Sequence, residues 1–206
     1  MNILFFDATN DWIIVKVYQT DKELYSYSGN HPRESSFRLI TDISKALDSV
    51  GIEKPDRIVT CLGPGSFTGI RITVSTARNL AQIWNIPVTG IDSVEMTASW
   101  YFHKTGKPVL ALLEGKQKKV YAGYFDGNYK GGFDLLPLDI PRVFSEEERN
   151  CVISNSELVQ YGQKMNEIPD PGYIIKKRIK EIINADVETN NYNNLLPNYI
   201  RGSYVE

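Results

Sequence analysis

The chain contains the stretch Cys61-Leu-Gly-Pro-Gly-Ser-Phe-Thr-Gly-Ile-Arg-Ile72, in which an apolar run passes through a glycine-dense turn into an amphipathic pattern. This order predicts a strand, a tight turn and a helix. Gly63, Gly65 and Gly69 permit positive φ or a close approach to another surface, and Pro64 restricts the turn between them. Backbone N–H groups at the start of the helix can meet a phosphate or a closely packed partner. A phosphate-binding turn and a plain strand-to-helix connection both remain open.

Strands and helices alternate around this turn. Short apolar runs bounded by turn residues predict strands at residues 2–6, 12–18, 23–28, 57–62 and 87–91. Apolar residues at helical spacing predict helices at residues 34–50 and 66–84. The polar segment Asp7-Ala-Thr-Asn-Asp11 predicts a hairpin between the first two strands, with a carboxylate and a hydroxyl at its tip. The pattern indicates an α/β lobe over residues 1–92.

The pattern of apolar and turn residues in the second half of the chain, residues 93–206, predicts a smaller lobe. We expect a helix at 93–102, strands at 109–113 and 120–125, and a turn-rich break at 127–132. Two further helices are expected at 156–166 and 173–184, and an exposed asparagine-rich loop at 190–194.

The helices of the first lobe carry more apolar residues than one core-facing stripe requires. On helix 34–50 the predicted stripe is Phe37, Ile40, Ile43, Leu47 and Val50, with Leu39 beside it. On helix 66–84 the predicted stripe is Ile70, Val74, Ala77, Ala81 and Trp84. Much of the remaining surface of this helix carries small side chains, those of Gly69, Thr73, Ser75 and Thr76. The excess indicates either an interaction face or ordinary core packing.

Composition limits the function classes. With 206 residues, of which 42% are hydrophobic, the chain can bury a substantial core. Its 23 basic and 25 acidic side chains give a net charge of -2. The overall charge of the chain therefore does not attract nucleic acid or an anionic membrane. Cys61 and Cys151 lie far apart, and neither a signal peptide nor a membrane span is expected. We therefore expect a cytoplasmic protein with reduced thiols, in which any RNA contact is local or made through a partner.

Few side chains point to catalysis. His31 and His103 are the only histidines, and neither has a second ligand at helical spacing, so we predict no metal site and no catalytic residue. The glycine stretch lacks the Lys-Ser/Thr that follows the last glycine of a P-loop. Asp7 and Thr9 suit a phosphate or a hydrated Mg²⁺, but the same residue types form Asx or Ser/Thr turns.

A basic turn lies between the strands at 109–113 and 120–125. Lys116, Lys118 and Lys119 suit contact with RNA phosphate, and they equally suit a solvated turn.

Several segments, in order along the chain, resemble the bacterial TsaB (YeaZ) family. They are Ile3–Thr9, Pro32-Arg-Glu34, Leu62–Ile72, Val120-Tyr121 and Pro197-Asn-Tyr-Ile-Arg201. The resemblance covers nearly the whole chain, and the glycine-rich Leu62–Ile72 is its most specific element. It implies the two-lobed α/β fold of actin, Hsp70 and sugar kinases (the ASKHA fold), with mixed sheets flanked by helices.

The resemblance also implies a function. It implies a non-catalytic subunit that supports its paralogue TsaD, with the ATPase TsaE, in threonylcarbamoyl transfer to adenosine 37 of tRNA. We therefore expect TsaD and TsaE as partners, contact with tRNA through the complex, a homodimer through the same helices, and no cofactor. ATP-dependent phosphorylation of a small molecule, by a kinase of the same superfamily, remains an alternative, and peptidase activity is a weaker one.

The positions that match the family give candidate site residues. A degenerate nucleotide site is expected at Asp7, Thr9, Gly63, Gly65 and Ser66. A partner interface is expected on helices 34–50 and 66–84, at Leu39, Ile43, Phe67, Gly69, Ile70, Arg71, Val74 and Arg78. The chain departs from the family pattern at Ser35 (histidine in many relatives), Glu114 (aspartate) and Thr73 (glycine), and we expect Thr73 to affect how closely the partner helix approaches.

Overall fold

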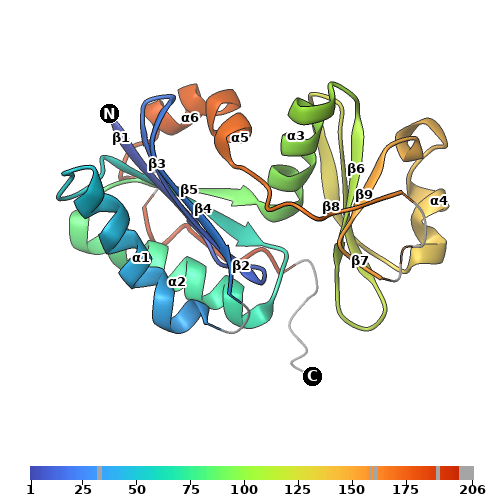
Figure 1. The fold of residues 1–206 in the computed structure, drawn as a ribbon, viewed down its shortest axis with the longest axis horizontal. Coiled ribbons are helices and arrows are strands. Elements are labelled where there is room, and N and C mark those ends of the chain that lie inside the picture. Colours follow the sequence, from blue (N-terminus) through green and yellow to red (C-terminus); the bar gives the residue numbers. More distant parts are fainter. Residues whose placement is uncertain (32–33, 158, 160–161, 189–190, 200–206) are drawn as a thin grey trace. The chain divides into compact units, whose positions relative to one another are not determined.

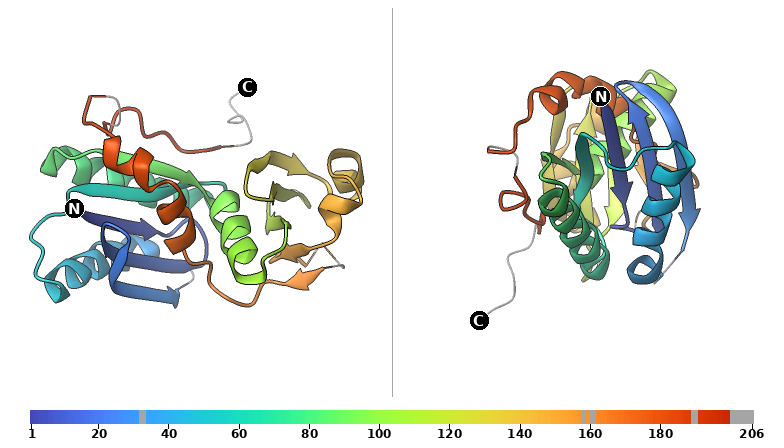
Figure 2. Two further views of the ribbon diagram at one scale, coloured as in Figure 1. Left: turned by 90° about the horizontal axis from the view of Figure 1, so that it is seen from above. Right: turned by 90° about the vertical axis from the view of Figure 1, so that its left-hand side faces the viewer.

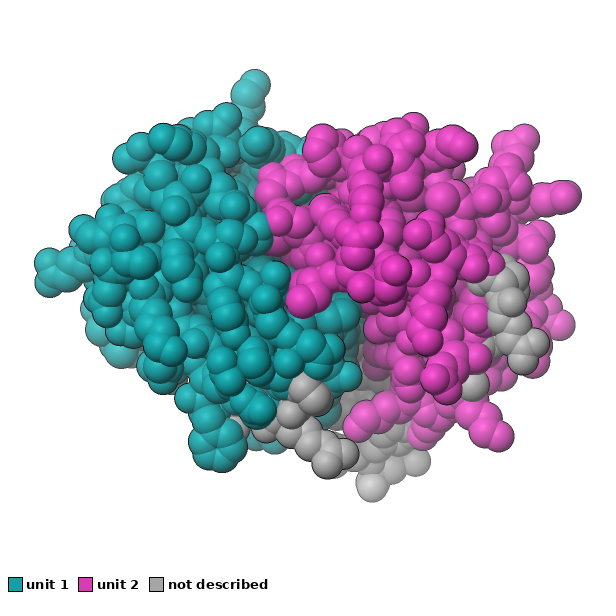
Figure 3. All heavy atoms as spheres, in the orientation of Figure 1, with its two compact units in different colours: residues 1–92, 174–198 teal, residues 93–173, 199–206 magenta. Residues whose placement is uncertain are grey.

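The computed structural model describes residues 1–31, 34–157, 159, 162–188 and 191–199, with the backbone alone at residues 35–36. It forms two compact units, coloured separately in Figure 3. Unit 1 comprises Met1–Asp92 and Ile174–Asn198, and unit 2 comprises Ser93–Tyr173 and Tyr199. We placed residues 174–198 in the second lobe from the sequence, and the structure instead packs them with unit 1. Asn198 N donates to Leu62 O at 2.8 Å and so ties this segment to the first sheet.

Unit 1 is built on a five-stranded mixed sheet of order β3-β2-β1-β4-β5 (Figure 1). The strands are β1 (Asn2–Asp7), β2 (Trp12–Gln19), β3 (Lys22–Asn30), β4 (Arg57–Gly63) and β5 (Val88–Asp92). The first three strands form antiparallel pairs, and β4 runs parallel to both β1 and β5. The predicted hairpin at the N-terminus is confirmed, because Asn2 pairs with Gln19 and Asp7 with Ile14.

Two long helices, α1 (Ser35–Ser49) and α2 (Phe67–Trp84), lie side by side against this sheet (Figures 1 and 2). Both pack on the same apolar face, since the core cluster joins Leu4 and Phe6 of β1 and Val15 of β2 to residues of both helices. Alternation along the strands explains this, because residues two apart in a strand point to the same side of the sheet.

The core-facing stripe predicted for α2 is confirmed, whereas the one predicted for α1 is partly wrong. Ile70, Val74, Ala77 and Ala81 of α2 are buried. On α1 the core instead takes Leu39, Ile43, Ala46 and Leu47, which recur at helical spacing. Phe37 and Ile40 are then left on the outer side, 80% and 55% exposed. The helix has two overlapping apolar stripes, and its periodicity alone does not say which one meets the sheet.

Unit 2 contains a second five-stranded mixed sheet, of order β10-β9-β6-β7-β8. Its elements are α3 (Ser93–Thr105), β6 (Val109–Glu114), β7 (Val120–Phe125), β8 (Tyr129–Leu135), η1 (Pro137–Asp139), α4 (Ile140–Val143), η2 (Glu147–Arg149), β9 (Val152–Ser154) and β10 (Gln163–Lys164). The α/β fold class with two mixed sheets flanked by helices is therefore confirmed.

Two predictions in the second half of the chain were wrong. The expected break at 127–132 lies largely within β8, which pairs with β7 despite its glycines. The expected helix at 156–166 is absent from the described residues of that range, and β10 is found there instead. The expected helical segment 173–184 is confirmed, but it consists of two short helices, α5 (Gly172–Lys177) and α6 (Ile179–Asn184), because Arg178 leaves helical geometry. None of the described helices has the length and hydropathy of a membrane span.

Candidate functional site

The hairpin tip and the glycine turn meet at the carboxyl ends of β1 and β4. Ser66 N donates to Thr9 O at 2.7 Å, and Thr9 N donates to Asp7 Oδ1 at 2.9 Å. Ser66 also caps α2, since its hydroxyl accepts from Gly69 N at 3.2 Å. We call residues 7–9 and 63–69 the hairpin–turn junction. It brings together all the residues predicted for the nucleotide site.

The glycines of this junction allow two backbones to touch. A Cβ on Gly65 would overlap Thr9 O, and a Cβ on Gly69 would overlap Ala8 O. Gly63 has φ +98°, a conformation that side chains rarely permit. The glycine pattern therefore serves close packing of α2 on the hairpin. The amides of Thr9 and Ser66 are engaged within the protein, which leaves neither of them free for a phosphate.

The pKa of Asp7, the acid of the junction, is shifted from its usual value. Its side chain is completely buried, and this burial raises the pKa to about 6, although hydrogen bonds from Thr9, Ala8 and Cys61 act in the opposite direction. Asp7 Oδ2 has no hydrogen-bond partner in the described part of the chain. The carboxyl group thus sits where a charge is costly, and a neutral form is favoured more than in water.

Thr73 faces the junction and not the outer side of α2. It is fully buried, and its Oγ1 accepts a hydrogen bond from Ala8 N at 3.0 Å. The expectation that Thr73 changes the approach of a partner helix is therefore wrong for this structure, because the side chain is used inside unit 1.

Asn198 adds a contact that the sequence analysis did not predict. Its Nδ2 donates to Asp92 Oδ2 at 2.8 Å, and its backbone N donates to Leu62 O. Asn198 O would lie 3.3 Å from a Cβ on Gly63. The segment before Tyr199 thus closes over the ends of β4 and β5 beside the glycine turn. Pro197-Asn198 belonged to a family motif, but nothing in the sequence linked it to an acid at residue 92.

The outer faces of α1 and α2 carry exposed apolar side chains. Phe37 and Ile40 on α1 and Phe67 and Ile83 on α2 are 80%, 55%, 50% and 74% exposed. The Arg71 guanidinium lies 5.3 Å from the centre of the Phe67 ring, which is the geometry of a cation–π contact.

Only some of the predicted interface residues lie on this outer face. Phe67 and Arg71 are exposed and Arg78 is half-buried. Gly69 is buried against the hairpin. The other predicted residues lie in the core of unit 1, where their side chains are between 1% and 3% exposed: Leu39, Ile43, Ile70 and Val74. In this structure these four support the helices from inside and do not reach the outer face.

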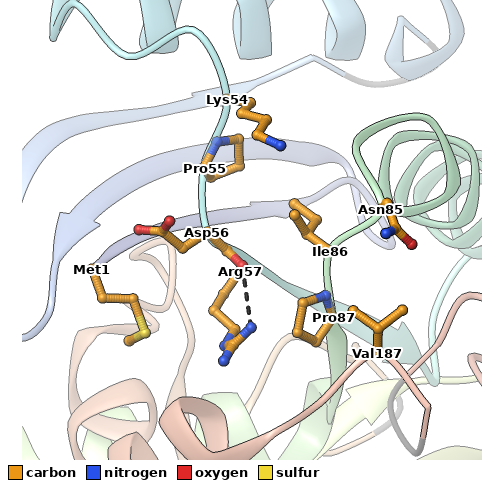
Figure 4. Close-up of a pocket in the computed structure, with 9 residues that line it drawn as sticks. All are labelled: Met1, Lys54, Pro55, Asp56, Arg57, Asn85, Ile86, Pro87 and Val187. Carbon is orange, nitrogen blue, oxygen red and sulfur yellow. Dashed lines mark hydrogen bonds between the residues drawn. The ribbon is translucent and has the colours of Figure 1, made fainter.

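A separate hollow of about 520 Å³ lies at the opposite edge of the first sheet (Figure 4). It is lined by Met1, Lys54, Pro55, Asp56, Arg57, Asn85, Ile86, Pro87 and Val187. All of these residues except Val187, which follows α6, precede β1, β4 or β5 or lie at the start of one of them, whereas ligands of open α/β sheets bind beyond the carboxyl ends.

The charged groups of this hollow are already paired. Arg57 donates to Ile183 O at 3.1 Å and to Asp56 O at 3.4 Å, and the Asp56 carboxylate accepts from Asn2 N at 2.6 Å. Lys54 Nζ donates to Trp84 O at 3.5 Å. The hollow therefore lies where neighbouring loops meet, and its charged groups do not indicate a ligand site.

The remaining sequence candidates have structural partners. His31 is hydrogen-bonded to Tyr27 at 2.7 Å, and the ring of His103 stacks on Tyr173 at 4.8 Å. Lys119 pairs with Asp134 at 3.5 Å. Within the described ranges, His, Cys, Asp and Glu side chains form no group of three or more that could hold a metal ion.

The two other departures from the family pattern are Glu114 and Ser35. Glu114 is exposed at the end of β6, where its backbone N donates to Asn155 Oδ1 at 2.6 Å. The side chain of Ser35, like Pro32 and Arg33, lies outside the described residues.

Comparison with known proteins identifies relatives over most of the chain. The family model for TsaD, tRNA N6-adenosine threonylcarbamoyltransferase, matches residues 13–146. The tRNA threonylcarbamoyladenosine biosynthesis protein TsaB of Buchnera aphidicola subsp. Schizaphis graminum is 33% identical over 127 residues, which is 60% of each chain. TsaB of Bacillus subtilis is 29% identical over 143 residues, which is 68% of this chain and 60% of the relative. The matched segments thus span 60% of the length of these two relatives.

A solved structure has the same fold. YeaZ from Pseudomonas aeruginosa superposes with a TM-score of 0.77 over 95% of this chain and 98% of its own, at 20% sequence identity. At this identity the likeness concerns the fold.

Proposed function

Because this chain belongs to the TsaD family, and within it to the TsaB (YeaZ) group, we propose that it is a non-catalytic subunit for threonylcarbamoyl transfer to tRNA. Its task is to bind the TsaD-type subunit that performs the transfer, with the TsaE-type ATPase joining the assembly. It meets adenosine 37 of tRNA only through that complex, in the cytoplasm, and needs no cofactor or metal of its own.

The observation that carries this proposal is the apolar outer face of α1 and α2. Phe37 and Ile40 point away from the core on one helix, and Phe67 does so on the neighbouring helix. Large apolar side chains gathered on adjacent helices are typical of a surface that packs against another protein. We assign the partner interface to this outer face, which we call the docking face. It is also the surface through which two copies of the chain pair.

The hairpin–turn junction supports the absence of catalysis. In this junction the Ser66 amide is bonded to Thr9 O and the carboxylate of Asp7 is fully buried. A phosphate at the start of α2 would have to displace that hydrogen bond and meet a buried acid without a compensating cation. This arrangement favours a closed structural contact over a working nucleotide site and disfavours the small-molecule kinase alternative.

The test is complex formation with the TsaD-type protein of the same organism. We expect a stable heterodimer in size-exclusion chromatography with light scattering, and we expect Phe37→Glu and Phe67→Glu each to weaken it at least tenfold. Both side chains are at least half exposed in the free chain, so the substitutions leave the fold intact. Val74→Arg is unsuitable, because Val74 is 2% exposed and the change would disrupt the core.

The matched control is Leu138→Glu, because Leu138 is an exposed apolar residue of unit 2, 68% exposed. It should bind the TsaD-type protein like the wild type. If the wild type forms no complex even with the TsaE-type ATPase and nucleotide present, the proposal is wrong. Turnover of ATP by the isolated chain would instead favour the kinase alternative.

A further inference from the structure

The docking face continues into a polar hollow along α2. Ser75, Arg78, Asn79 and Gln82 of α2 line this hollow of about 270 Å³ together with Tyr192 of the C-terminal segment. We infer that it receives the carboxylate of an Asp or Glu side chain from the protein that docks on α1 and α2. The inference rests on the proposed function and names the chemistry of the partner's surface.

The hollow is built from hydrogen-bond donors. Arg78 contributes a charged planar fork of N–H groups, Asn79 and Gln82 contribute amide N–H groups, and Ser75 and Tyr192 contribute hydroxyls. None of the described residues that line it is acidic. A guanidinium flanked by neutral donors matches the two oxygens of a carboxylate.

Within the described residues, these donors have no partners. In the described part of the chain, none of the five lining side chains makes a hydrogen bond or ion pair. The hollow in Figure 4 differs in this respect, because its arginine, lysine and aspartate are all bonded to neighbouring groups. The α2 hollow therefore offers hydrogen-bond donors that have no partner among the described residues, whereas the charged groups of the hollow in Figure 4 are already bonded.

The lining residues lie on one side of α2 and on the segment that follows α6. Ser75, Arg78, Asn79 and Gln82 follow the i, i+3, i+4, i+7 spacing, which puts them on one side of the helix. Tyr192 packs against the core of unit 1, so its ring is held while its hydroxyl stays at the hollow. The lining donors therefore lie on one side of α2, next to this ring.

Continuity with the docking face favours a protein carboxylate as the occupant. Phe67, Arg71, Ser75, Arg78 and Gln82 succeed one another along a single stripe of α2. The helix contains Arg71 and Arg78 and no acidic residue, so its field favours an acidic partner. Phe67 and Arg78 lie about 16 Å apart along the axis. A complementary helix would carry an apolar residue opposite Phe67 and an acidic residue about three turns away.

The test measures the affinity of the full-length chain for the TsaD-type protein by titration calorimetry at low and high salt. We expect Arg78→Gln to raise the Kd about ten- to a hundredfold and to reduce its salt dependence. Tyr192→Phe keeps the ring on the core and removes one donor, and we expect a rise of a few-fold. Lys22→Gln is the charge-matched control, because Lys22 is an exposed cation of β3 and lies on neither helix of the docking face, and the Kd of this variant should be unchanged.

Charge exchange identifies the occupant. We expect Arg78→Glu to abolish binding, and one Asp→Arg or Glu→Arg substitution on the partner's docking helix to restore it. Wild-type binding with an unchanged Kd for Arg78→Gln overturns this inference and leaves the proposed function standing. An unchanged Kd together with weaker tRNA binding by the assembled complex would also overturn it, and would assign the hollow to an RNA phosphate. Failure of the wild type to bind removes both proposals.

Discussion

Thr73 Oγ1, within α2, accepts a hydrogen bond from the backbone N of Ala8 at the tip of the β1–β2 hairpin, at 3.0 Å and with both residues buried. The bond joins two elements 65 residues apart in the chain. It anchors the helix of the docking face to the sheet at the point where the two backbones approach most closely. We expect substitutions that remove or add a single atom at this junction to change the stability of the protein.

Thr73→Val tests this hydrogen bond. Valine has nearly the same shape, but it leaves the buried Ala8 amide without an acceptor, so we expect the free energy of unfolding to fall by about 1–3 kcal/mol. Thr73→Ser keeps the hydroxyl and loses one methyl group, and it should cost about 1 kcal/mol or less. Urea unfolding of both variants provides the comparison. Equal stability of the valine variant and the wild type would contradict the assigned bond.

Gly69→Ala tests the close approach of α2 to the hairpin. Alanine favours a helix over glycine by about 1 kcal/mol, yet here its Cβ would overlap Ala8 O, which is backbone and cannot turn away. We therefore expect the variant to have a lower melting temperature than the wild type. Ser75→Ala, on the exposed side of the same helix, is the control and should be neutral or slightly stabilising. A raised melting temperature for Gly69→Ala would show that the helix does not touch the hairpin.

Asp7 should make the stability of the protein depend on pH. Burial raises its pKa from 3.8 to about 6 in the folded state, so the folded protein binds the proton more tightly than the unfolded chain. The resulting stabilisation is fully present below the unfolded pKa and is lost as the pH rises through 6. Between pH 5 and pH 8 the loss amounts to about 1.4 kcal/mol.

Asp7→Asn removes this titration and keeps an oxygen that can accept from Thr9 N. We expect the wild type to lose stability relative to the variant between pH 5 and pH 8, by urea unfolding at both values. If the two proteins keep a constant difference over that range, Asp7 does not titrate there.

The sequence predicted most of the first unit and less of the second. Strands β1, β2 and β4 and helix α2 carry long apolar patterns with clear turn residues at their ends, so their positions follow from local physics. On α1 we predicted Phe37 and Ile40 in the core-facing stripe and Leu39 at the interface, whereas Leu39 is buried and Phe37 and Ile40 are exposed. Phe37 and Leu39 belong to competing stripes, and only the packed sheet selects between them. In unit 2, β8 contains Gly131 and Gly132 and is stabilised by pairing with β7, which local propensity does not register.

The hairpin–turn junction shows a different limit. The structure brings its predicted residues together, yet glycines that cradle a phosphate and glycines that admit a neighbouring backbone look the same in sequence. Only the position of Thr9 O beside Gly65 distinguishes them. The contact of Asn198 with Asp92 had no local signal at all, since it joins residues 106 positions apart.

Asn198→Ala tests whether the C-terminal segment is held by that contact. The substitution removes the donor to Asp92 Oδ2 and keeps the backbone N–H that bonds to Leu62 O. Losing one hydrogen bond to a carboxylate costs about 1.4 kcal/mol or more, which corresponds to about a tenfold change in a local opening equilibrium. We therefore expect hydrogen exchange at the amide of residue 198 to accelerate about tenfold, while the amides of β1 and β4 exchange as in the wild type. Asn193→Ala, an exposed asparagine of the same segment, should leave this exchange unchanged. Faster exchange across the whole first sheet would instead mean that the segment contributes to global stability, because the sheet and the segment would then open together.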